Sequence, residues 1–269
     1  MSNRRSGRKA CCLSLIQGCV DEVATNIEKY PKEDIICMPP SLKDKLLVRI
    51  THSHTLTNTL NLEYCLPLLF HSRTRVISLR NVRTANIQKV SEELVNEIGK
   101  CQELRVLMFP AHVRCSPKVL KALFIKLPKL EQLFMTYCST INDEVIQVLS
   151  YSCPKLRYCN LTGSKVDNPG MMSLGRLTDL VCIAVSETPI GHEGISALVE
   201  GPSGKNLKEL KIDNCVNVTE ATLRKIVECC PDMEILIFYN CDRSISEMMF
   251  TPQENQLKNL KQLSWTINW

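Results

Sequence analysis

The sequence predicts an α/β solenoid in the form of a horseshoe, with a parallel β-sheet on the concave face, α-helices on the convex face and a short α-helical cap at the N-terminal end. Three observations predict it. An apolar block recurs about every 26 residues, an apolar set at helical spacing recurs between the blocks, and two further columns of residues keep the same register. Units that cannot bury an apolar face alone stack and share one continuous core.

The recurring block has the pattern Leu-x-x-Leu-x-Leu. Its second and third apolar residues are two positions apart, so both side chains point inward from one short strand. A weaker first copy starts near Val76 and Leu79, and we expect seven to eight repeats over residues 73–269. The residues that open the clear blocks are spaced by 26, 26, 24, 27, 26 and 27 positions: Leu104, Leu130, Leu156, Leu180, Leu207, Met233 and Leu260.

A helix is expected in the second half of each repeat, because apolar residues recur there at intervals of three and four. Four capping-type residues, Asn142, Asp167, Thr219 and Ser246, stand where such helices should begin. The apolar sets are Val145, Val148 and Leu149, then Ile195 and Leu198, then Leu223, Ile226 and Val227.

Fifteen cysteines are spread along the chain, and no two form a Cys-x-x-Cys pair. Many follow the repeat period, whereas a metal site needs ligands clustered at short spacing, so no metal is expected. We interpret the cysteines as reduced thiols that act as small buried apolar residues. One column of mainly small residues, expected where each strand turns toward its helix, contains His112, Cys138, Ser164, Thr188, Cys215, Cys241 and Asn268.

The N-terminal region differs from the repeats. Residues 1–10 are basic and are expected to form a flexible tail, and residues 11–72 are expected to form the helical cap. A short apolar run from Ala10 to Val20 is interrupted by Gln17 and Gly18, which argues against a signal peptide. No stretch approaches the ~20 apolar residues that span a bilayer. We expect a cytoplasmic protein without membrane attachment; a nuclear address within Arg4–Lys9 is the alternative to a plain tail.

The net charge of +5 is unevenly distributed. Residues 1–126 hold 20 basic and 11 acidic side chains, a balance of +9, whereas the remainder holds 13 and 17, a balance of −4. No basic groove interleaved with aromatic residues is evident, so nucleic acid is not the expected partner. Four arginines near the first repeat form either a patch for an acidic partner or, as we favour, solvated arginines at an edge: Arg73, Arg75, Arg80 and Arg83.

No motif for catalysis, cofactor binding or metal binding is present. The chain lacks a P-loop and the patterns GxGxxG, HExxH and GxSxG. His112 falls on the turn column, His52 and His54 are expected in a solvated loop, and His192 has no second histidine four residues later. We therefore expect a non-enzymatic protein with no catalytic residues and no cofactor.

Residues between the inward-facing apolar positions are expected on the concave surface. Several are large and apolar, and exposed clusters of that kind are typical of binding surfaces with aromatic anchors. The alternative is that they pack on one another or beneath a terminal tail. The candidate partner-binding residues are Val106, Met108, Phe134, Tyr158, Asn160, Glu209, Lys211, Ile235, Ile237 and Tyr239.

Two motifs give a family resemblance. The segment Cys-Pro-Lys-Leu at 153–156 and Cys138 are similar to the cysteine-containing subclass of leucine-rich repeats, which is typical of F-box proteins. Four further segments resemble the animal homologues of the yeast antagonist of mitotic exit network protein: MPPSLKDKLLVRI (38–50), GPSGKNLKEL (201–210), NCVNVT (214–219) and LKQLSWT (260–266).

The resemblance implies an intracellular regulator of protein turnover or cell-cycle exit that binds other proteins and has no catalytic residues, and we expect it to be monomeric apart from its partners. Its most direct form is a substrate-recognition adaptor of an SCF-type ubiquitin ligase, which promotes proteasomal turnover and docks on the ligase linker subunit through residues 38–70. The alternative is a ligase-independent scaffold or inhibitor that binds a cell-cycle protein of the mitotic exit pathway.

The F-box resemblance is incomplete. Met38-Pro39-Pro40-Ser41 and the following Leu42, Leu46, Leu47 and Ile50 match its first part, but the valine-cysteine-x-x-tryptophan-like remainder is absent. Both tryptophans stand at the far end, at positions 265 and 269. We favour a cap that shields the first repeat from water over an F-box-like remnant.

Overall fold

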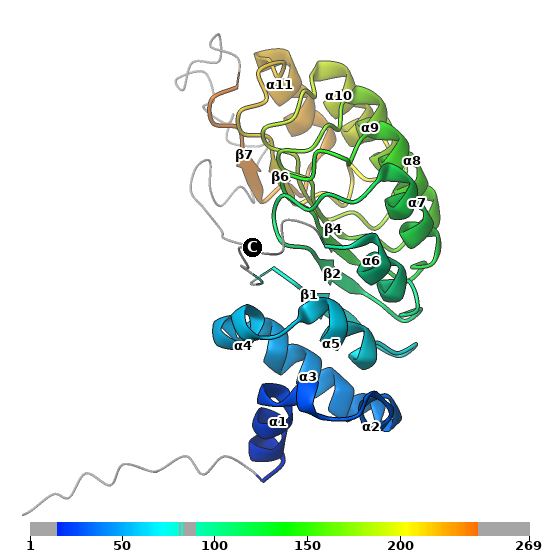
Figure 1. Ribbon diagram of the computed structural model, residues 1–269. Coiled ribbons are helices and arrows are strands. Elements are labelled where there is room, and N and C mark those ends of the chain that lie inside the picture. Colours follow the sequence, from blue (N-terminus) through cyan, green and yellow to red (C-terminus); the bar gives the residue numbers. More distant parts are fainter. Residues whose placement is uncertain (1–14, 81, 83–89, 242–269) are drawn as a thin grey trace, which may run out of the picture.

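The computed structural model describes residues 15–80, 82 and 90–241, and it consists of a curved parallel sheet with helices along its outer side (Figure 1). In this part of the chain, seven strands of three residues pair in the order of the sequence, so each repeat lies beside the next. The strands are β1 (Val76–Ser78), β2 (Val106–Met108), β3 (Gln132–Phe134), β4 (Tyr158–Asn160), β5 (Cys182–Ala184), β6 (Glu209–Lys211) and β7 (Ile235–Ile237).

The strand register confirms the predicted repeat. The second apolar position of each block pairs with the same position in the neighbouring blocks, and each of these side chains is at most 3% exposed. They are Ile77, Leu107, Leu133, Cys159, Ile183, Leu210 and Leu236. The predicted block at Leu260 and the cap residue Ser246 lie outside the described residues.

The first, weak copy begins two residues earlier than predicted. Ile77, not Leu79, pairs with Leu107, so Thr74 occupies the position that leucine holds in later repeats. Thr74 is fully buried, and its hydroxyl oxygen accepts a hydrogen bond from the backbone N–H of His71 at 3.2 Å. A buried polar residue whose hydrogen bond is satisfied locally replaces an apolar one here, and the apolar pattern alone cannot reveal it.

Helices follow the strands and cover the convex side (Figure 1). The predicted capping residues Asn142, Asp167 and Thr219 immediately precede three of them, and Asn142 Oδ1 accepts a hydrogen bond from the N–H of Val145 at 3.1 Å. The helices are α6 (Glu92–Ile98), α7 (Pro117–Ile125), α8 (Asp143–Ser152), α9 (Asn168–Leu174), α10 (His192–Glu200) and α11 (Glu220–Cys229).

The cap consists of short helices below β1 (Figure 1). Its centre is α3, which buries Leu46, Leu47 and Ile50 and packs against α1. An ion pair between Asp21 and Arg49 ties these two helices together. The elements are α1 (Leu15–Thr25), a 3-10 turn (Ile27–Lys29), α2 (Lys32–Cys37), α3 (Pro40–His52), α4 (His54–Thr59) and α5 (Leu62–Leu69).

The helix starts of successive units are joined by side chains. Glu63 in the first turn of α5 accepts a hydrogen bond from the backbone N–H of Ser91, the residue that caps α6, at 3.1 Å. Asp143 of α8 accepts one from the N–H of Asp167, the cap of α9, at 2.8 Å. Because Glu63 makes the same kind of contact, α5 belongs to the ladder of convex helices as its first member.

The turn after each of the strands β2 to β7 contains one residue in the left-handed region. Tyr137, Glu187, Asn214 and Asn240 have φ between +53° and +58°, and Gly163 has +69°. The backbone N–H of each donates across to the next repeat where that contact is described, as from Tyr137 to the carbonyl of Thr162. The next residue in sequence is the small, buried side chain of the turn column, such as Cys138 and Ser164.

His112 was predicted in that small-residue column, and this prediction is wrong. His112 is exposed, has φ of +65° and donates its N–H to the carbonyl of Thr136, so it matches Tyr137 instead. The repeat of β2 has one additional residue in its turn, which places the buried Val113 in the column. Its carbonyl accepts a hydrogen bond from the thiol of Cys138 at 3.2 Å.

Most described cysteines are buried within the repeats. The thiol of Cys153 donates to the carbonyl of Leu127 at 3.4 Å, and the thiol of Cys241 donates to that of Ile212 at 3.1 Å. Burial raises the pKa of the Cys153 thiol to about 12, which keeps it protonated. Cys19 and Cys37, in the cap, are exposed. Across the described ranges, no cluster of three or more His, Cys, Asp or Glu side chains has a geometry that could hold a metal ion.

Candidate partner-binding surface

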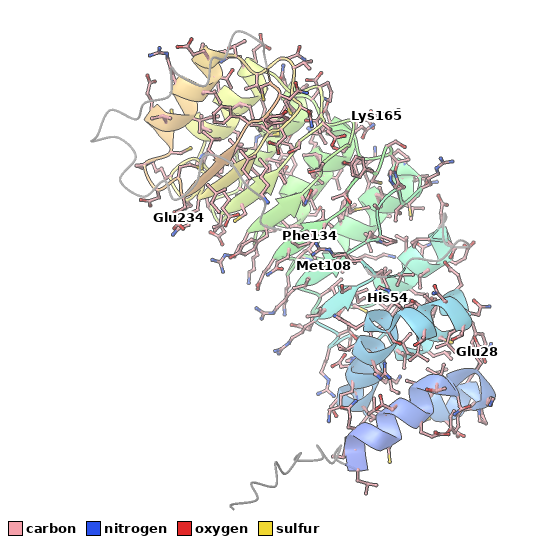
Figure 2. All side chains as sticks on the ribbon, turned by 90° about the vertical axis from the view of Figure 1, so that its left-hand side faces the viewer. Glu28, His54, Met108, Phe134, Lys165 and Glu234 are labelled. Atoms are coloured by element: carbon pink, nitrogen blue, oxygen red, sulfur yellow. The ribbon has the colours of Figure 1, made fainter. Side chains whose placement is uncertain are left out.

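The concave surface is built from the first and third residues of each strand. In a strand of three residues the middle side chain points into the core, and its two neighbours point to the opposite face. Figure 2 looks onto this side and shows Met108 and Phe134 next to each other on the sheet. The candidate residues within the strands therefore lie in two parallel rows: Val106, Tyr158, Glu209 and Ile235 in one, and Met108, Phe134, Asn160, Lys211 and Ile237 in the other.

These side chains differ in exposure. Phe134 is only 9% exposed, which is deeper than expected, and it lies in register between Met108 and Asn160. The other strand members of the set are half-buried. Tyr239 follows β7 in the turn and is 76% exposed, so it lies at the rim. The concave surface is thus largely apolar and half-buried, and the exposed side chain of Tyr239 lies at its edge.

A cation–π contact lies in the aromatic part of the concave surface. The guanidinium of Arg157 lies over the ring of Tyr158, 5.7 Å from its centroid. Arg157 stands in the position immediately before β4, where the equivalent residues of β2, β3 and β6 are Arg105, Glu131 and Lys208. Arg105 pairs with Glu131 at 2.6 Å across adjacent repeats. Sequence reasoning did not identify this row, although its charged residues recur at the repeat period.

The centre of the surface combines small residues with a partly desolvated charge pair. Cys182 and Ala184 are each 4% exposed. Beside them, burial raises the pKa of the Glu209 carboxyl above its ordinary value and lowers the pKa of Lys211. Burial, followed by the charge of Glu209, raises the pKa of the Cys182 thiol to about 12. One carboxylate oxygen of Glu209, Oε2, is buried and has no hydrogen-bond partner among the described residues.

A network of hydrogen bonds fixes a further carboxylate at the end of β6. Asp213 accepts a hydrogen bond from the hydroxyl of Ser186 at 3.0 Å and another from the backbone N–H of Tyr239 at 3.1 Å. Its own backbone N–H donates to the Ser186 hydroxyl oxygen at 3.2 Å. This carboxylate is held in place by three successive repeats, and it lies next to the Glu209 and Lys211 positions along the strand.

The rim next to β3 and β5 contains a contact that the sequence did not predict. The hydroxyl of Tyr137 donates to Glu187 Oε1 at 2.9 Å, across the repeat that contains Gly163. His112 stacks on Tyr137 with ring centroids 5.1 Å apart. The sequence did contain a signal for this rim position. Gly163, Asn214 and Asn240 recur at one position of the turn, and glycine and asparagine are residue types that tolerate positive φ.

The predicted basic patch is only partly assembled. Arg73 and Arg75 both line a groove between α3 and β1, and both are exposed. Arg80 is also exposed, but it is not among the residues that line this groove. Arg83 lies outside the described residues.

The described helices contain none that is both long and apolar enough to cross a lipid bilayer. Several histidines contact polar groups that lie close to them in space. His192 Nδ1 lies 3.2 Å from the Thr222 hydroxyl, and His52 Nδ1 lies 2.9 Å from the carbonyl of Val48.

The fold and the repeated concave rows define a class of protein: the chain is a leucine-rich-repeat solenoid that serves as a protein-protein interaction module. No model of a known protein family matches it. Its sequence is 29% identical to the putative F-box/LRR-repeat protein 9 of Arabidopsis thaliana over 202 residues, which is 68% of this chain and 75% of that protein.

Two fungal proteins are also similar. The antagonist of mitotic exit network protein 1 is 22% identical over 147 residues in Saccharomyces cerevisiae and 25% identical over 151 residues in Eremothecium gossypii. These matches cover 52% and 53% of this chain but only 27% and 38% of the fungal proteins. The chain is thus homologous to F-box/LRR proteins and to the fungal mitotic-exit antagonists, as the resemblance predicted. Its place among the animal homologues stays a prediction.

Solved structures show weaker likeness. A chain from the crystal structure of the Rad7 and Elc1 complex in yeast has 15% identity and a TM-score of 0.40, with 84% of this chain and 67% of that chain covered. The internalin InlF of Listeria monocytogenes has 12% identity and a TM-score of 0.47, with 75% and 50% covered.

Proposed function

We propose that this protein is a non-enzymatic substrate-recognition adaptor of an SCF-type ubiquitin ligase, acting in the cytoplasm as a monomer apart from its partners. The concave surface binds the protein that is to be degraded, and residues 38–70 of the cap dock on the linker subunit. The observation that carries the proposal is the continuous concave surface with aromatic and aliphatic side chains in register. The F-box/LRR relative, which matches most of this chain, supports the ligase connection.

The chemistry of the concave surface favours a protein partner with apolar anchors. Met108, Phe134 and Tyr158 form one apolar cluster, and Ile235 and Ile237 form another. Aromatic and aliphatic anchors of this kind dominate the binding energy of protein interfaces. Between the two clusters the half-buried Glu209 and Lys211 offer opposite charges, which select a partner with complementary charges because desolvated charges are costly when unpaired.

The cap exposes some apolar side chains, such as Ile36 and Val48, but they are not the ones that carry the F-box resemblance. The apolar residues that carry the F-box resemblance, Leu46, Leu47 and Ile50, are buried in the cap itself. Docking on the linker subunit must therefore use the exposed side chains of α3 and α4, such as Lys45, His52, Thr55 and Asn58. Substitutions at these positions test docking without disturbing the core of the cap.

The concave surface is tested by a pull-down from cells with the full chain. The double variant Phe134→Ala and Tyr158→Ala should lose the bound substrate protein and retain cullin and the linker subunit. Gln147→Glu, an exposed change on the convex helix α8, serves as the control and should retain both. Retention of the same partner by the folded double variant would remove the concave-surface proposal.

The cap is tested with two variants, Lys45→Glu with His52→Glu on α3, and Thr55→Glu with Asn58→Glu on α4. At least one should lose cullin and the linker subunit while retaining the substrate protein. If both variants recover cullin as the unaltered chain does, or if the unaltered chain recovers none, the ligase part of the proposal is wrong.

A second candidate function is a ligase-independent scaffold or inhibitor of a mitotic exit signalling protein. The two fungal relatives, which are named as antagonists of that network, favour it. It predicts that the pull-down recovers a partner without cullin and that neither cap variant changes this recovery. The two candidates share the concave surface and differ only in the role of the cap.

A further inference from the structure

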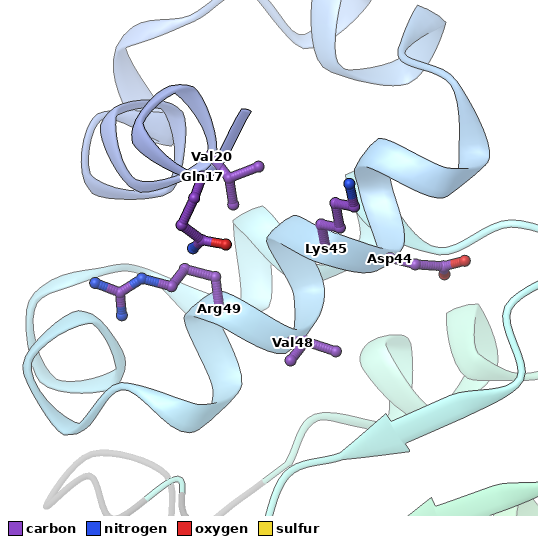
Figure 3. A pocket seen from close by; sticks show the side chains of 6 residues that line it. All are labelled: Gln17, Val20, Asp44, Lys45, Val48 and Arg49. Atoms are coloured by element: carbon purple, nitrogen blue, oxygen red, sulfur yellow. The ribbon is translucent and has the colours of Figure 1, made fainter. Parts of the chain in front are cut away.

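A groove of about 640 Å³ separates the cap from the first strand. One wall is α3, which contributes Asp44 and Val48, and the other is the chain that leads into β1, which contributes Arg73, Arg75 and Val76. Figure 3 shows the side chains of Asp44 and Val48 projecting from α3 on the side of the strands. Val48 is 50% exposed and Val76 is 45% exposed, so the groove has apolar walls that are open to solvent.

The strand along this groove is an edge strand. β1 pairs only with β2, and no other strand of the described chain lies on its far side. The carbonyl of Arg75 accepts a hydrogen bond from the N–H of Val106 at 3.0 Å, and the N–H of Leu79 donates to the carbonyl of Met108 at 2.7 Å. Alternate residues of a parallel ladder face the same neighbour, so the backbone groups of Val76 and Ser78 face away from β2. Such an edge can accept another extended chain.

The groove is positively charged. Arg73 and Arg75 take part in none of the ion pairs of the described residues, whereas the neighbouring Lys129 is paired with Glu103. The pKa of Glu103 is lowered first by its hydrogen bond to Lys129, and the charge of Arg75 lowers it further. Asp44, the one carboxylate among the lining residues, lies 3.0 Å from Nε2 of His71. The two guanidinium groups therefore remain available to an acidic ligand.

We propose that this groove binds an extended, acidic segment of a partner protein, which pairs with β1 as an additional strand and places carboxylates beside Arg73 and Arg75. No strand pairs with the far edge of β1 in the described chain, although α3 packs beside it. This unpaired edge and the two exposed valines favour a polypeptide over a nucleic acid, because a nucleic acid would use only the arginines. Val76 begins one of the concave rows, and α3 lies within the segment proposed to dock on the linker subunit, but none of the candidate concave residues lines the groove. The proposal does not depend on the proposed function, because it needs neither the ligase nor a partner on the concave surface.

The charge requirement is tested by fluorescence anisotropy of a labelled synthetic peptide of alternating glutamate and valine, titrated with the full chain at physiological ionic strength. Arg73→Glu and Arg75→Glu should each weaken binding by roughly fivefold, the effect of one exposed ion pair. Arg80→Glu makes the same charge change outside the groove and should leave binding unchanged, because salt screens distant charges. Equal weakening by all three variants would overturn the proposal.

The strand-pairing requirement is tested on the peptide, which avoids any question of folding. A peptide with N-methyl groups on alternate residues along one edge keeps its charge but loses its backbone donors, and it should bind at least tenfold more weakly. Undiminished binding of the methylated peptide, or tighter binding of an oligothymidylate of equal charge, would contradict the proposal. Phe134→Ala, on the concave surface, should not change the affinity for the unmodified peptide.

Discussion

The repeats and the cap are stabilised by contacts of different kinds. In the repeats one position has one role: the middle residue of each described strand is buried, and the turn after each of β2 to β7 contains one left-handed residue. In the cap each contact occurs once, such as the ion pair of Asp21 with Arg49 and the acceptance by Glu28 of the Asn61 N–H at 2.5 Å. Among the described helices of the cap, only α5 takes part in the recurring pattern, through Glu63. The structure of a repeat is therefore specified by the same contact at many positions of the sequence. The structure of the cap depends on contacts that each occur only once.

The largest expected effect compares core residues of the two regions. Leu133→Ala and Ile50→Ala each remove a fully buried side chain, and each should lower the free energy of unfolding by about 3 kcal/mol. Amide hydrogen exchange should distinguish the two variants by the region in which exchange becomes faster. Because each repeat contacts only its neighbours, Ile50→Ala should accelerate exchange in the cap and first repeat but not at β6 and β7. Uniform acceleration along the chain by Ile50→Ala would show that cap and repeats unfold as one unit.

A smaller effect is expected in the turn ladder. Gly163 has φ of +69°, and a Cβ there would lie 2.3 Å from the Tyr137 ring. Gly163→Ala should therefore destabilise the protein by about 2 kcal/mol, in part from backbone strain and in part from the clash. Chemical denaturation of the single and double variants should show that Gly163→Ala lowers the free energy of unfolding by less when Tyr137 is also replaced by alanine. Strict additivity of the two changes would mean that the ring does not limit the site.

The equivalence of repeat positions gives a third, smaller effect. Cys215 holds the position that Thr188 holds in the preceding repeat, and both side chains donate to the carbonyl of Val185, at 3.3 Å and 2.6 Å. Cys215→Ala should cost about 1 kcal/mol through the lost hydrogen bond and volume, while Cys215→Thr should cost less than half of that. Thermal denaturation measures both, and an equal cost would show that the column positions are not interchangeable.

The smallest effect concerns pH. Burial raises the folded-state pKa of Glu209, so its ionised form opposes folding above the ordinary carboxyl pKa. Glu209→Gln should therefore stabilise the protein at pH 7 by about 0.5 kcal/mol after solvent screening, and this gain should vanish below about pH 4. Glu144→Gln is the control with the opposite sign, because hydrogen bonding to Lys121 lowers the pKa of Glu144. A gain from Glu209→Gln that does not change with pH would exclude titration as its cause.

The sequence predicted those parts of the fold in which a pattern is repeated. The strand positions, the inward leucines and the helix caps at Asn142, Asp167 and Thr219 all follow from spacing. The exceptions are local departures from the period, namely the buried Thr74 in place of leucine and the additional turn residue at His112. A single polar residue or a single insertion leaves the spacing of neighbouring blocks almost unchanged, so the pattern cannot locate it.

The two proposed binding surfaces were predictable to different degrees. Alternation along the strands placed Met108 and Phe134 on one face, but the depth of Phe134 depends on the side chains around it. The groove at β1 was not predictable, since it joins Val48 of the cap to Val76 of the first strand. No periodic signal connects two residues from unrelated elements, and only their packing brings them together.

The left-handed turns have a consequence for the length of the array. The left-handed residues from His112 to Asn214 each donate their N–H to the following repeat, so the rim forms a second ladder of hydrogen bonds that runs beside the sheet. The helix starts form a third, from Asp143 to the cap of α9. If one unit, such as the one from β4 to α9, were duplicated or deleted, its neighbours would still find matching hydrogen-bond partners in the sheet, at the rim and at the helix starts. The length of the concave surface would change by about 5 Å for each unit.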